Sequence, residues 1–348
     1  MVTIRTTADE LLAEARTQVG AIRSVALSSV GGTVAGRSSA APSTRRPSVG
    51  GGRQVELRMS DEIAAIRAAA LVARSAVDAA LRNAVVGTRP ETLAAIVAGV
   101  VAAARAESAL QVLPFDALDG GDRPFPAACC VAVNERLIHA LPSDRPLKDG
   151  DVVTVDAAVR LGGWCADVAD CAVVGRGTGR SVSMVEGCRE MMEAAVATIA
   201  PGVRWSRVAM AMQAIAQVRS LGIVTKYAGH GVGRSLHEAP VAPCGLDEAF
   251  LERSDFTLLP DMVLSIEPTV VSSPDGLQTI DGRGFAIGCE LVADADGWTM
   301  CTRSGLPGCS VERTVLVTRN GCEVLDEEPT VMSAAVLGRH VAVPAVVN

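Results

Sequence analysis

Four acidic residues lie inside apolar stretches of the chain, where carboxylates are uncommon: Asp156, Asp167, Glu267 and Glu312. A buried carboxylate is costly unless it is paired or binds a metal. Each of them alone is better explained as an edge-strand or salt-bridged residue. Together with a histidine they favour a site for two divalent cations, because oxygen ligands with one imidazole suit such ions. Bridging carboxylates hold two such ions about 3.5–4 Å apart.

The histidines add to this pattern. Of the four, His230 and His237 share a glycine-rich segment, residues 229–238, while His139 follows an apolar stretch and His340 lies near the end of the chain. Glycines let backbone and ligands approach closely, and the seven-residue separation places two imidazoles near one cleft. A glycine-rich loop with histidine is by itself equally compatible with a structural role.

Four blocks of sequence, taken in this order, resemble the type I methionine aminopeptidases, which have the pita-bread fold. The blocks cover roughly residues 57 to 327. They are Phe125-Pro126-Ala127-Ala128-Cys129-Cys130-Val131-Ala132-Val133-Asn134 leading to His139, then Asp156 with Asp167, then Gly229 to Pro240, and finally Glu267-Pro268 with Glu312.

The resemblance implies a dinuclear centre that holds Co, Mn, Fe or Zn. Asp156 would chelate one ion and His230 with Glu267 the other, while Asp167 and Glu312 would bridge both. A water between the ions would be the nucleophile, and Glu267 would accept its proton.

The resemblance also implies which residues meet the substrate. His237 would stabilise the tetrahedral oxyanion, and His139 would contact the scissile amide. Trp298 is equally compatible with a plain core position. The side chains expected to bind substrate are His139, Cys130, Phe125, Leu236, His237, Thr269 and Trp298.

The chain departs from the family where the side chain of the substrate would be held. Leu236 stands where phenylalanine is usual, Thr269 stands where methionine is usual, and Tyr227 is the only tyrosine. With fewer aromatic walls, we expect a wider and less selective pocket. Arg313 follows Glu312 where histidine is common, and a cation there could alter metal affinity.

The order of expected elements predicts an α+β fold built from two halves that face one another. Residues 1–55 are expected to be a low-complexity extension with a short helix over 6–22, residues 56–327 the catalytic domain, with an inserted loop over 272–294, and residues 328–348 a tail. Helices are expected over 60–77, 91–109, 184–199 and 206–221, strands over 125–138, 262–271 and 310–317, and a hairpin over 151–174.

Composition excludes several classes of protein. The chain has 348 residues, a formal net charge of −7, 49% hydrophobic residues and 3% aromatic residues. Mild acidity without a basic tract argues against nucleic acid as a partner. The longest apolar stretch is shorter than the ~20 residues of a membrane span, and no export signal is recognisable. We therefore expect a cytoplasmic protein whose ten cysteines are reduced.

The first hypothesis is an aminopeptidase that removes N-terminal methionine from nascent chains when the second residue is small. Nascent polypeptide N-termini are then the partners, with a ribosome contact through the extension as a further expectation. A same-fold aminopeptidase with altered or broader preference, including the X-Pro type, is the alternative. A non-catalytic pita-bread binding protein is the third hypothesis.

Overall fold

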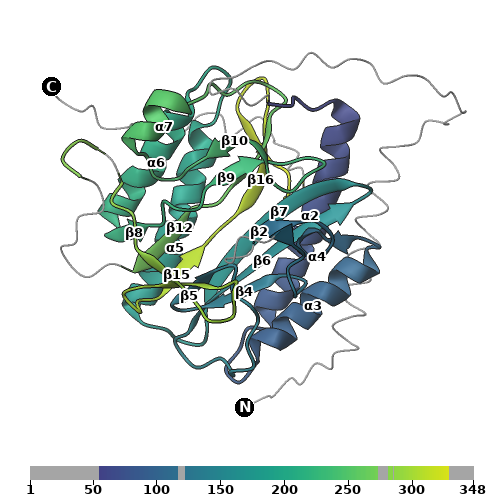
Figure 1. Cartoon of the computed structure of the whole chain (residues 1–348), viewed down its shortest axis with the longest axis vertical. Helices are drawn as coiled ribbons and strands as arrows, with labels where there is room; N and C mark the ends of the chain where they lie inside the picture. Colours follow the sequence, from purple (N-terminus) through teal and green to yellow (C-terminus); the bar gives the residue numbers. More distant parts are fainter. Residues whose placement is uncertain (1–54, 117–121, 273–280, 285, 329–348) are drawn as a thin grey trace, which may run out of the picture.

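The computed structural model describes residues 55–116, 122–272, 281–284 and 286–328. The helix expected over 6–22, nearly all of the extension and the tail from residue 329 lie outside the described residues. In the described part, the chain forms two halves, each with a sheet and covering helices, as Figure 1 shows. The expected pair of α+β halves is confirmed.

The first half is built on a seven-stranded sheet. Its strands run in the order β1-β6-β4-β5-β14-β13, with β7 paired to β6. The bounds are β1 Glu107–Ser108, β4 Cys130–Val133, β5 Arg136–Ile138, β6 Val152–Leu161, β7 Trp164–Val173, β13 Leu291–Ala293 and β14 Met300–Thr302.

Helix α2 (Ser60–Arg82) packs against β6 and β7, and α3 (Pro90–Ala103) packs against α2. Ile66, Ala69 and Ala73 on α2 are fully buried at helical spacing. Most of the buried residues of α2 are alanines, whose small side chains allow close packing against the sheet. Smaller elements follow, namely α4 (Ala109–Val112), β2 (Phe115–Asp116) and β3 (Asp122–Arg123).

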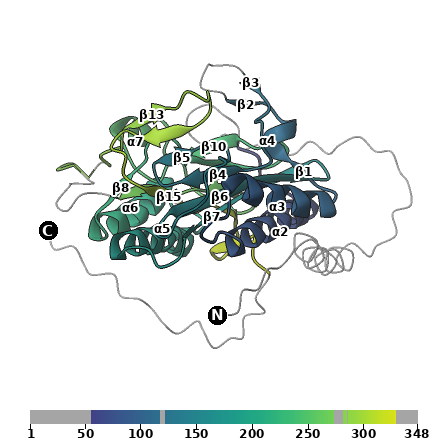
Figure 2. The same cartoon turned by 90° about the horizontal axis from the view of Figure 1, so that it is seen from below.

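The second half contains a five-stranded sheet, β10-β9-β11-β16-β17, and a three-stranded sheet, β15-β12-β8. Helices α5 and α6 lie on the same outer side of the molecule as α2 and α3 (Figure 2). The bounds are α5 Gly179–Thr198, α6 Trp205–Val218, α7 Glu248–Arg253, β8 Leu221–Ile223, β9 Gly229–Gly231, β10 Glu238–Ala242, β11 Val263–Ile266, β12 Thr269–Ser272, β15 Gly308–Ser310, β16 Arg313–Val317 and β17 Cys322–Val324.

The hairpin expected over 151–174 is confirmed as β6 and β7. Its turn is Gly162-Gly163, where both residues have positive φ, +60° and +85°, as a tight two-residue hairpin turn requires. Asp156 pairs with Ala169, and Ala158 pairs with Asp167. Because residues two apart on a strand share a face, both aspartates point to the same side of the sheet.

The two halves are joined at a short seam between β7 and the start of β16. Ala169 and Glu312 exchange both backbone hydrogen bonds, at 3.2 and 2.8 Å. Beside them, the Thr314 hydroxyl donates to the Asp167 carbonyl at 2.8 Å and accepts from the Asp167 N–H at 3.0 Å. Two of the expected metal ligands therefore lie on the strands that meet at this seam.

Five expected elements differ from the structure. The strands expected over 262–271 and 310–317 are each two strands, β11 with β12 and β15 with β16, because the chain passes between the five-stranded and the three-stranded sheet at Glu267-Pro268 and at Val311-Glu312. The helix expected over 91–109 ends at Ala103, because Arg105 has a positive φ and the chain turns back to pair β1 with β6. The strand expected over 125–138 is a small hairpin, β4 and β5, that turns at Asn134 with φ +54°. The insertion expected to be a loop over 272–294 ends in a strand, β13, although residues 273–280 and 285 lie outside the described part.

All ten cysteines lie in the described part and are free thiols, as expected. No helix among the described residues combines the length and the apolar character that crossing a membrane requires.

Candidate metal centre

The expected metal ligands come from both halves and converge at the seam. Asp167, His230 and Glu312 are buried, and each offers one ligand atom such that the three atoms lie within 4.8 Å of one another. The Nε2 atom of His230 lies 3.9 Å from Glu267 Oε1 and 3.9 Å from Glu312 Oε1. Asp156 lines the same pocket as Glu267 and Glu312. The structure thus brings together all five side chains that the sequence singled out.

Strand register explains why these side chains meet. His230 on β9 pairs with Ser265 on β11, and Ser265 in turn pairs with Thr314 on β16. The Ser265 hydroxyl donates a hydrogen bond of 2.5 Å to Glu312 Oε1. Glu267 follows two residues after Ser265, so its side chain emerges on the same face.

The glycines beside His230 are required by the backbone. A Cβ on Gly229 would lie 2.4 Å from the Ser265 carbonyl oxygen, and one on Gly231 would lie 2.2 Å from the Ala239 carbonyl oxygen. Such contacts are too short for any larger residue. These glycines therefore serve the close approach of neighbouring strands, whereas the sequence suggested the close approach of a ligand.

The protonation of His230 suits a metal ligand. Burial, with the neighbouring His237 ring as second cause, lowers its pKa to about 3, so the imidazole is neutral at pH 7. Its Nδ1 atom lies 3.0 Å from the Gly231 carbonyl oxygen, which has no proton to give. Nδ1 must therefore donate, and Nε2 keeps a free lone pair directed at the carboxylates.

The carboxylates repel one another. Desolvation raises the pKa of Asp156 to about 6 and the pKa of Glu267 to about 8. Desolvation, followed by repulsion from neighbouring acids, holds the pKa values of Asp167 and Glu312 well above their usual range. Within the described part, Asp167 Oδ1 is buried without a hydrogen-bond partner. Buried oxygens of this kind, beside a neutral imidazole, fit divalent cations.

A pocket lined by Asp156, Glu267 and Glu312 opens at these ligands. Three of the residues expected to bind substrate line it: Cys130, His139 and Thr269. Five residues that the sequence missed complete its walls, and one of them is Ile138 at the end of β5. The other four are Ala132, Leu137, Thr154 and Ser310. Thr154 and Ser310 each precede a carboxylate by two residues, so the two-residue period of a strand could have identified them.

Four of the seven residues expected to bind substrate do not line this pocket, and one of them is His237. Phe125, Leu236 and Trp298 are buried in the core of the first half. The rings of Phe125 and Trp298 pack edge to face with centroids 5.2 Å apart. That Phe125, Leu236 and Trp298 contact the substrate stays a prediction.

His237 lies at the open side of the site. Its side chain is exposed, and its ring packs edge to face against His230 with centroids 4.5 Å apart. The loop that precedes it is anchored to the hairpin turn, where the Cys165 N–H donates to the Gly233 carbonyl at 2.7 Å and Arg234 stacks 4.1 Å above the Trp164 ring. His139 lines the pocket and packs against Tyr227, with centroids 5.2 Å apart.

The chain is similar in sequence to known metallopeptidases. The sequence model of metallopeptidase family M24 matches residues 64–319. Methionine aminopeptidase from Treponema pallidum is 35% identical over 203 residues, which are 58% of this chain and 73% of that protein. Methionine aminopeptidase 1 from Bacillus subtilis is 31% identical over 205 residues, which are 59% of this chain and 75% of that protein.

The structure also resembles solved structures. The crystal structure of methionine aminopeptidase from Thermotoga maritima matches with a TM-score of 0.67 and 29% identity, over 79% of this chain and 100% of that one. Prolidase from Pyrococcus furiosus matches with a TM-score of 0.56 and 22% identity, over 78% and 65% of the two chains. The latter likeness concerns the fold alone, and together they confirm the expected pita-bread fold.

Proposed function

The chain belongs to metallopeptidase family M24, and from this premise we propose that it is an aminopeptidase that removes N-terminal methionine from proteins whose second residue is small. The observation that supports this most is the convergence of Asp167, His230 and Glu312 from both halves, beside Glu267 and Asp156. The matches to two proteins named methionine aminopeptidase span 73% and 75% of the length of those proteins.

Each ligand has a role in this proposal. Asp156 would hold one divalent ion, His230 and Glu267 the other, and Asp167 and Glu312 both. Such ions supply Lewis acidity and lower the pKa of water toward neutrality. Neutral His230 binds through Nε2, since Nδ1 donates to the Gly231 carbonyl. The Ser265 hydroxyl holds one oxygen of Glu312 in place.

The remaining side chains would act on the substrate. Glu267 is the proton acceptor, because it lies in the pocket beside the ligand cluster. His237, exposed at the open side, would donate a hydrogen bond to the developing oxyanion. His139 would contact the scissile amide from the pocket wall. The pocket itself would hold the side chain of the first residue.

The pocket also favours a second candidate, a same-fold aminopeptidase with a broader preference. Thr154, Thr269 and Ser310 place three hydroxyl groups along a pocket that a purely thioether-binding site would line with apolar groups. None of the aromatic residues expected from sequence lines it. A wall of this kind discriminates less sharply between methionine and other side chains of similar length.

The test is a panel of peptides. Protein reloaded with Mn²⁺ is incubated with Met-Ala-Ser, Leu-Ala-Ser, Ala-Ala-Ser and Ala-Pro-Ser, and free amino acids are measured with and without chelator. The proposal predicts chelator-sensitive release of methionine above all others. Equal release of leucine and alanine favours the broader enzyme, release from Ala-Pro-Ser alone the X-Pro type, and no release despite bound metal a binding protein.

The setting of this activity is part of the proposal. Nascent N-termini are the substrates, which places the protein in the cytoplasm, where they emerge. We propose residues 56–327 as the catalytic domain. The ribosome contact expected of residues 1–55 stays a prediction, because nearly all of that segment lies outside the described residues.

A further inference from the structure

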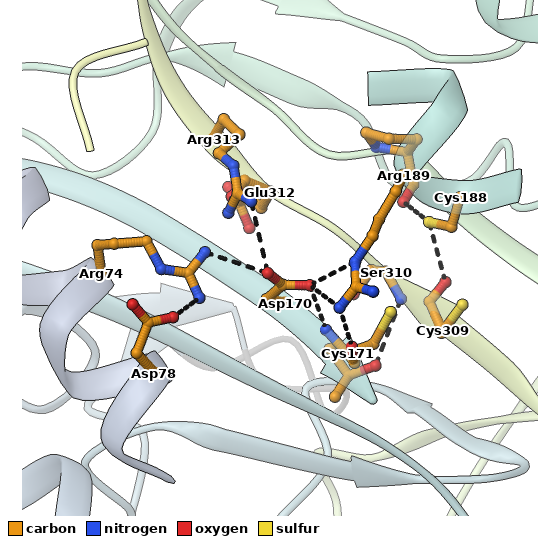
Figure 3. A network of polar contacts seen from close by, with 12 residues as sticks. Arg74, Asp78, Asp170, Cys171, Cys188, Arg189, Cys309, Ser310, Glu312 and Arg313 are labelled. Carbon is orange, nitrogen blue, oxygen red and sulfur yellow. Dashed lines mark hydrogen bonds and ion pairs between the residues drawn. The ribbon is translucent and has the colours of Figure 1, made fainter. Parts of the chain in front are cut away.

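A group of ion pairs lies behind the ligand cluster, on the other face of the seam. Asp170 on β7 forms ion pairs with three arginines, as Figure 3 shows. Arg74 of α2 lies 3.3 Å from Asp170 Oδ2, Arg313 of β16 lies 3.4 Å from the same atom, and Arg189 of α5 lies 3.1 Å from Asp170 Oδ1. These arginines come from both halves, so Asp170 ties the halves together.

The register places one of these pairs directly behind a metal ligand. Ala169 and Glu312 exchange their backbone hydrogen bonds across the seam, and Asp170 and Arg313 are the next residue of each strand. Because side chains alternate along extended backbone, Glu312 points to the ligand cluster and Arg313 to the opposite face. The Arg313 guanidinium, which follows Glu312 in the sequence, therefore lies on the face opposite the ligand cluster.

Arg313 also faces a second buried acid. Its Nη1 atom lies 3.6 Å from Oδ2 of Asp326, a residue with 0% exposure. Neither oxygen of Asp326 has a hydrogen-bond partner among the described residues. Arg313 and Asp170 are themselves largely buried, with 15% and 13% of their side-chain surface exposed. Removal of the Arg313 charge leaves two buried carboxylates with less compensation and loosens the contact between β7 and β16.

We infer that Arg313 is a positioning residue for the metal centre: its ion pair with Asp170 fixes the strand segment that carries Glu312 against the strand that carries Asp167, and its ion pair with Asp326 anchors the same segment within the second half. This inference rests on the proposed function, since it takes Glu312 and Asp167 as metal ligands. Partners of metal ligands that fix their orientation change metal affinity by about 10–100-fold when they are removed.

The experiment compares two arginines that contact the same aspartate. Full-length wild type, Arg313→Gln and Arg189→Gln are stripped of metal and titrated with Mn²⁺ by calorimetry, and the Tm of each apo protein is recorded. We expect Arg313→Gln to raise the Kd for Mn²⁺ about tenfold. Arg189 contacts Asp170 from a helix that carries no ligand, so its variant lowers Tm and leaves Kd unchanged within error. Arg313→Lys, which keeps the charge, restores most of the affinity.

The outcomes separate a positioning role from a structural one. An unchanged Kd in Arg313→Gln, or an equal rise in Arg189→Gln, overturns the inference. Should the glutamine variant fold poorly, Arg313→Met keeps the side-chain volume without the charge, and the same rise is expected of it. Methionine release by the wild type is measured in the same preparation. A wild type that binds no Mn²⁺ and releases no methionine contradicts the proposed function, whereas an active wild type beside an unaltered Arg313→Gln affinity contradicts only the positioning role.

Discussion

At the scale of single residues, His230 shows how the backbone prepares a ligand. Its ring is buried and neutral, and the Gly231 carbonyl fixes the proton on Nδ1. The lone pair of Nε2 is therefore available without any proton transfer. The neighbouring carboxyl groups, by contrast, must lose protons before they bind metal, because burial and mutual repulsion favour their protonated forms.

Metal binding should therefore release protons from the carboxyl groups. The pKa of Glu267 is raised from 4.5 to about 8 and that of Asp156 from 3.8 to about 6. A carboxyl group whose pKa is raised by folding lowers the free energy of unfolding of the apo protein at high pH. This loss of stability shrinks as the pH falls from the raised pKa toward the ordinary pKa. A cation needs the ionised forms, so its affinity should weaken as pH falls through the same window.

The measurement is calorimetric titration with Mn²⁺ at pH 7 in two buffers of different ionisation enthalpy. Proton release makes the observed binding enthalpy depend on the buffer. Identical enthalpies in both buffers would show that the acids are already ionised in the apo protein, against this expectation.

The pocket offers a second prediction at this scale. Thr269 lines the pocket, whereas Leu236 is buried in the core. Thr269→Met replaces a hydroxyl with a longer thioether and should raise the preference for methionine over leucine about tenfold, since one methylene of fit is worth roughly 10-fold or more. Leu236→Phe is the control, and its kcat/KM ratio for the two substrates should stay the same. A ratio that moves with Leu236 and not with Thr269 would place the specificity pocket elsewhere.

At the scale of elements, the β6–β7 hairpin sets the spacing of Asp156 and Asp167. Its turn needs two residues of positive φ, which the two glycines supply. Gly162→Ala meets no other atom within 4 Å, so only backbone strain acts. A left-handed alanine costs about 1–2 kcal/mol, which lowers Tm by about 2–4 °C per kcal/mol.

Gly179 provides the matched control for this substitution. It begins helix α5, has no atom within 4 Å of an added Cβ and does not have positive φ. Gly179→Ala should leave Tm unchanged or raise it slightly. Equal losses in both variants would mean that the hairpin turn tolerates alanine and that something else sets its conformation.

Element boundaries show what the sequence could and could not predict. The hairpin followed from two mostly apolar stretches on either side of the turn signal Gly162-Gly163, and Asn134 was an available turn signal within the stretch expected to be one strand. The early end of α3 was not predictable, because Ala104, Ala106 and Ala109 continue the apolar pattern while the chain turns at Arg105 to reach β6. The burial of Trp298 against Phe125 depends on tertiary packing between distant segments, which no local pattern carries.

At the scale of the whole molecule, the candidate metal centre lies at the seam where the two halves meet. Asp156 and Asp167 come from the first half and His230, Glu267 and Glu312 from the second. Four acids inside apolar stretches indicated a metal site, and the resemblance to the aminopeptidases supplied the full ligand set. The ion pairs of Arg313 behind it were not, since Arg74, Asp170 and Arg189 are far apart in sequence.

Because both halves contribute ligands, metal should stabilise the whole fold. An ion at about 100 times its Kd adds about 2.7 kcal/mol to the free energy of unfolding. We expect the Tm of the apo protein to rise by several degrees when Mn²⁺ is added, and chelator to reverse the rise. Asp167→Asn serves as control and should lose most of this shift. A metal-dependent rise of the same size in the variant would argue for binding away from the seam.

The most direct test is the release of methionine from Met-Ala-Ser by the apo protein as Mn²⁺ is added, with wild type beside Asp167→Asn. Asparagine keeps the size of the side chain and removes one of the charges that would bridge two ions. We predict no release of methionine without metal and release that increases with metal concentration in the wild type. In Asp167→Asn we predict little or no residual activity. Release that resists chelator, or that proceeds equally in Asp167→Asn, would contradict a metallopeptidase centred on the seam.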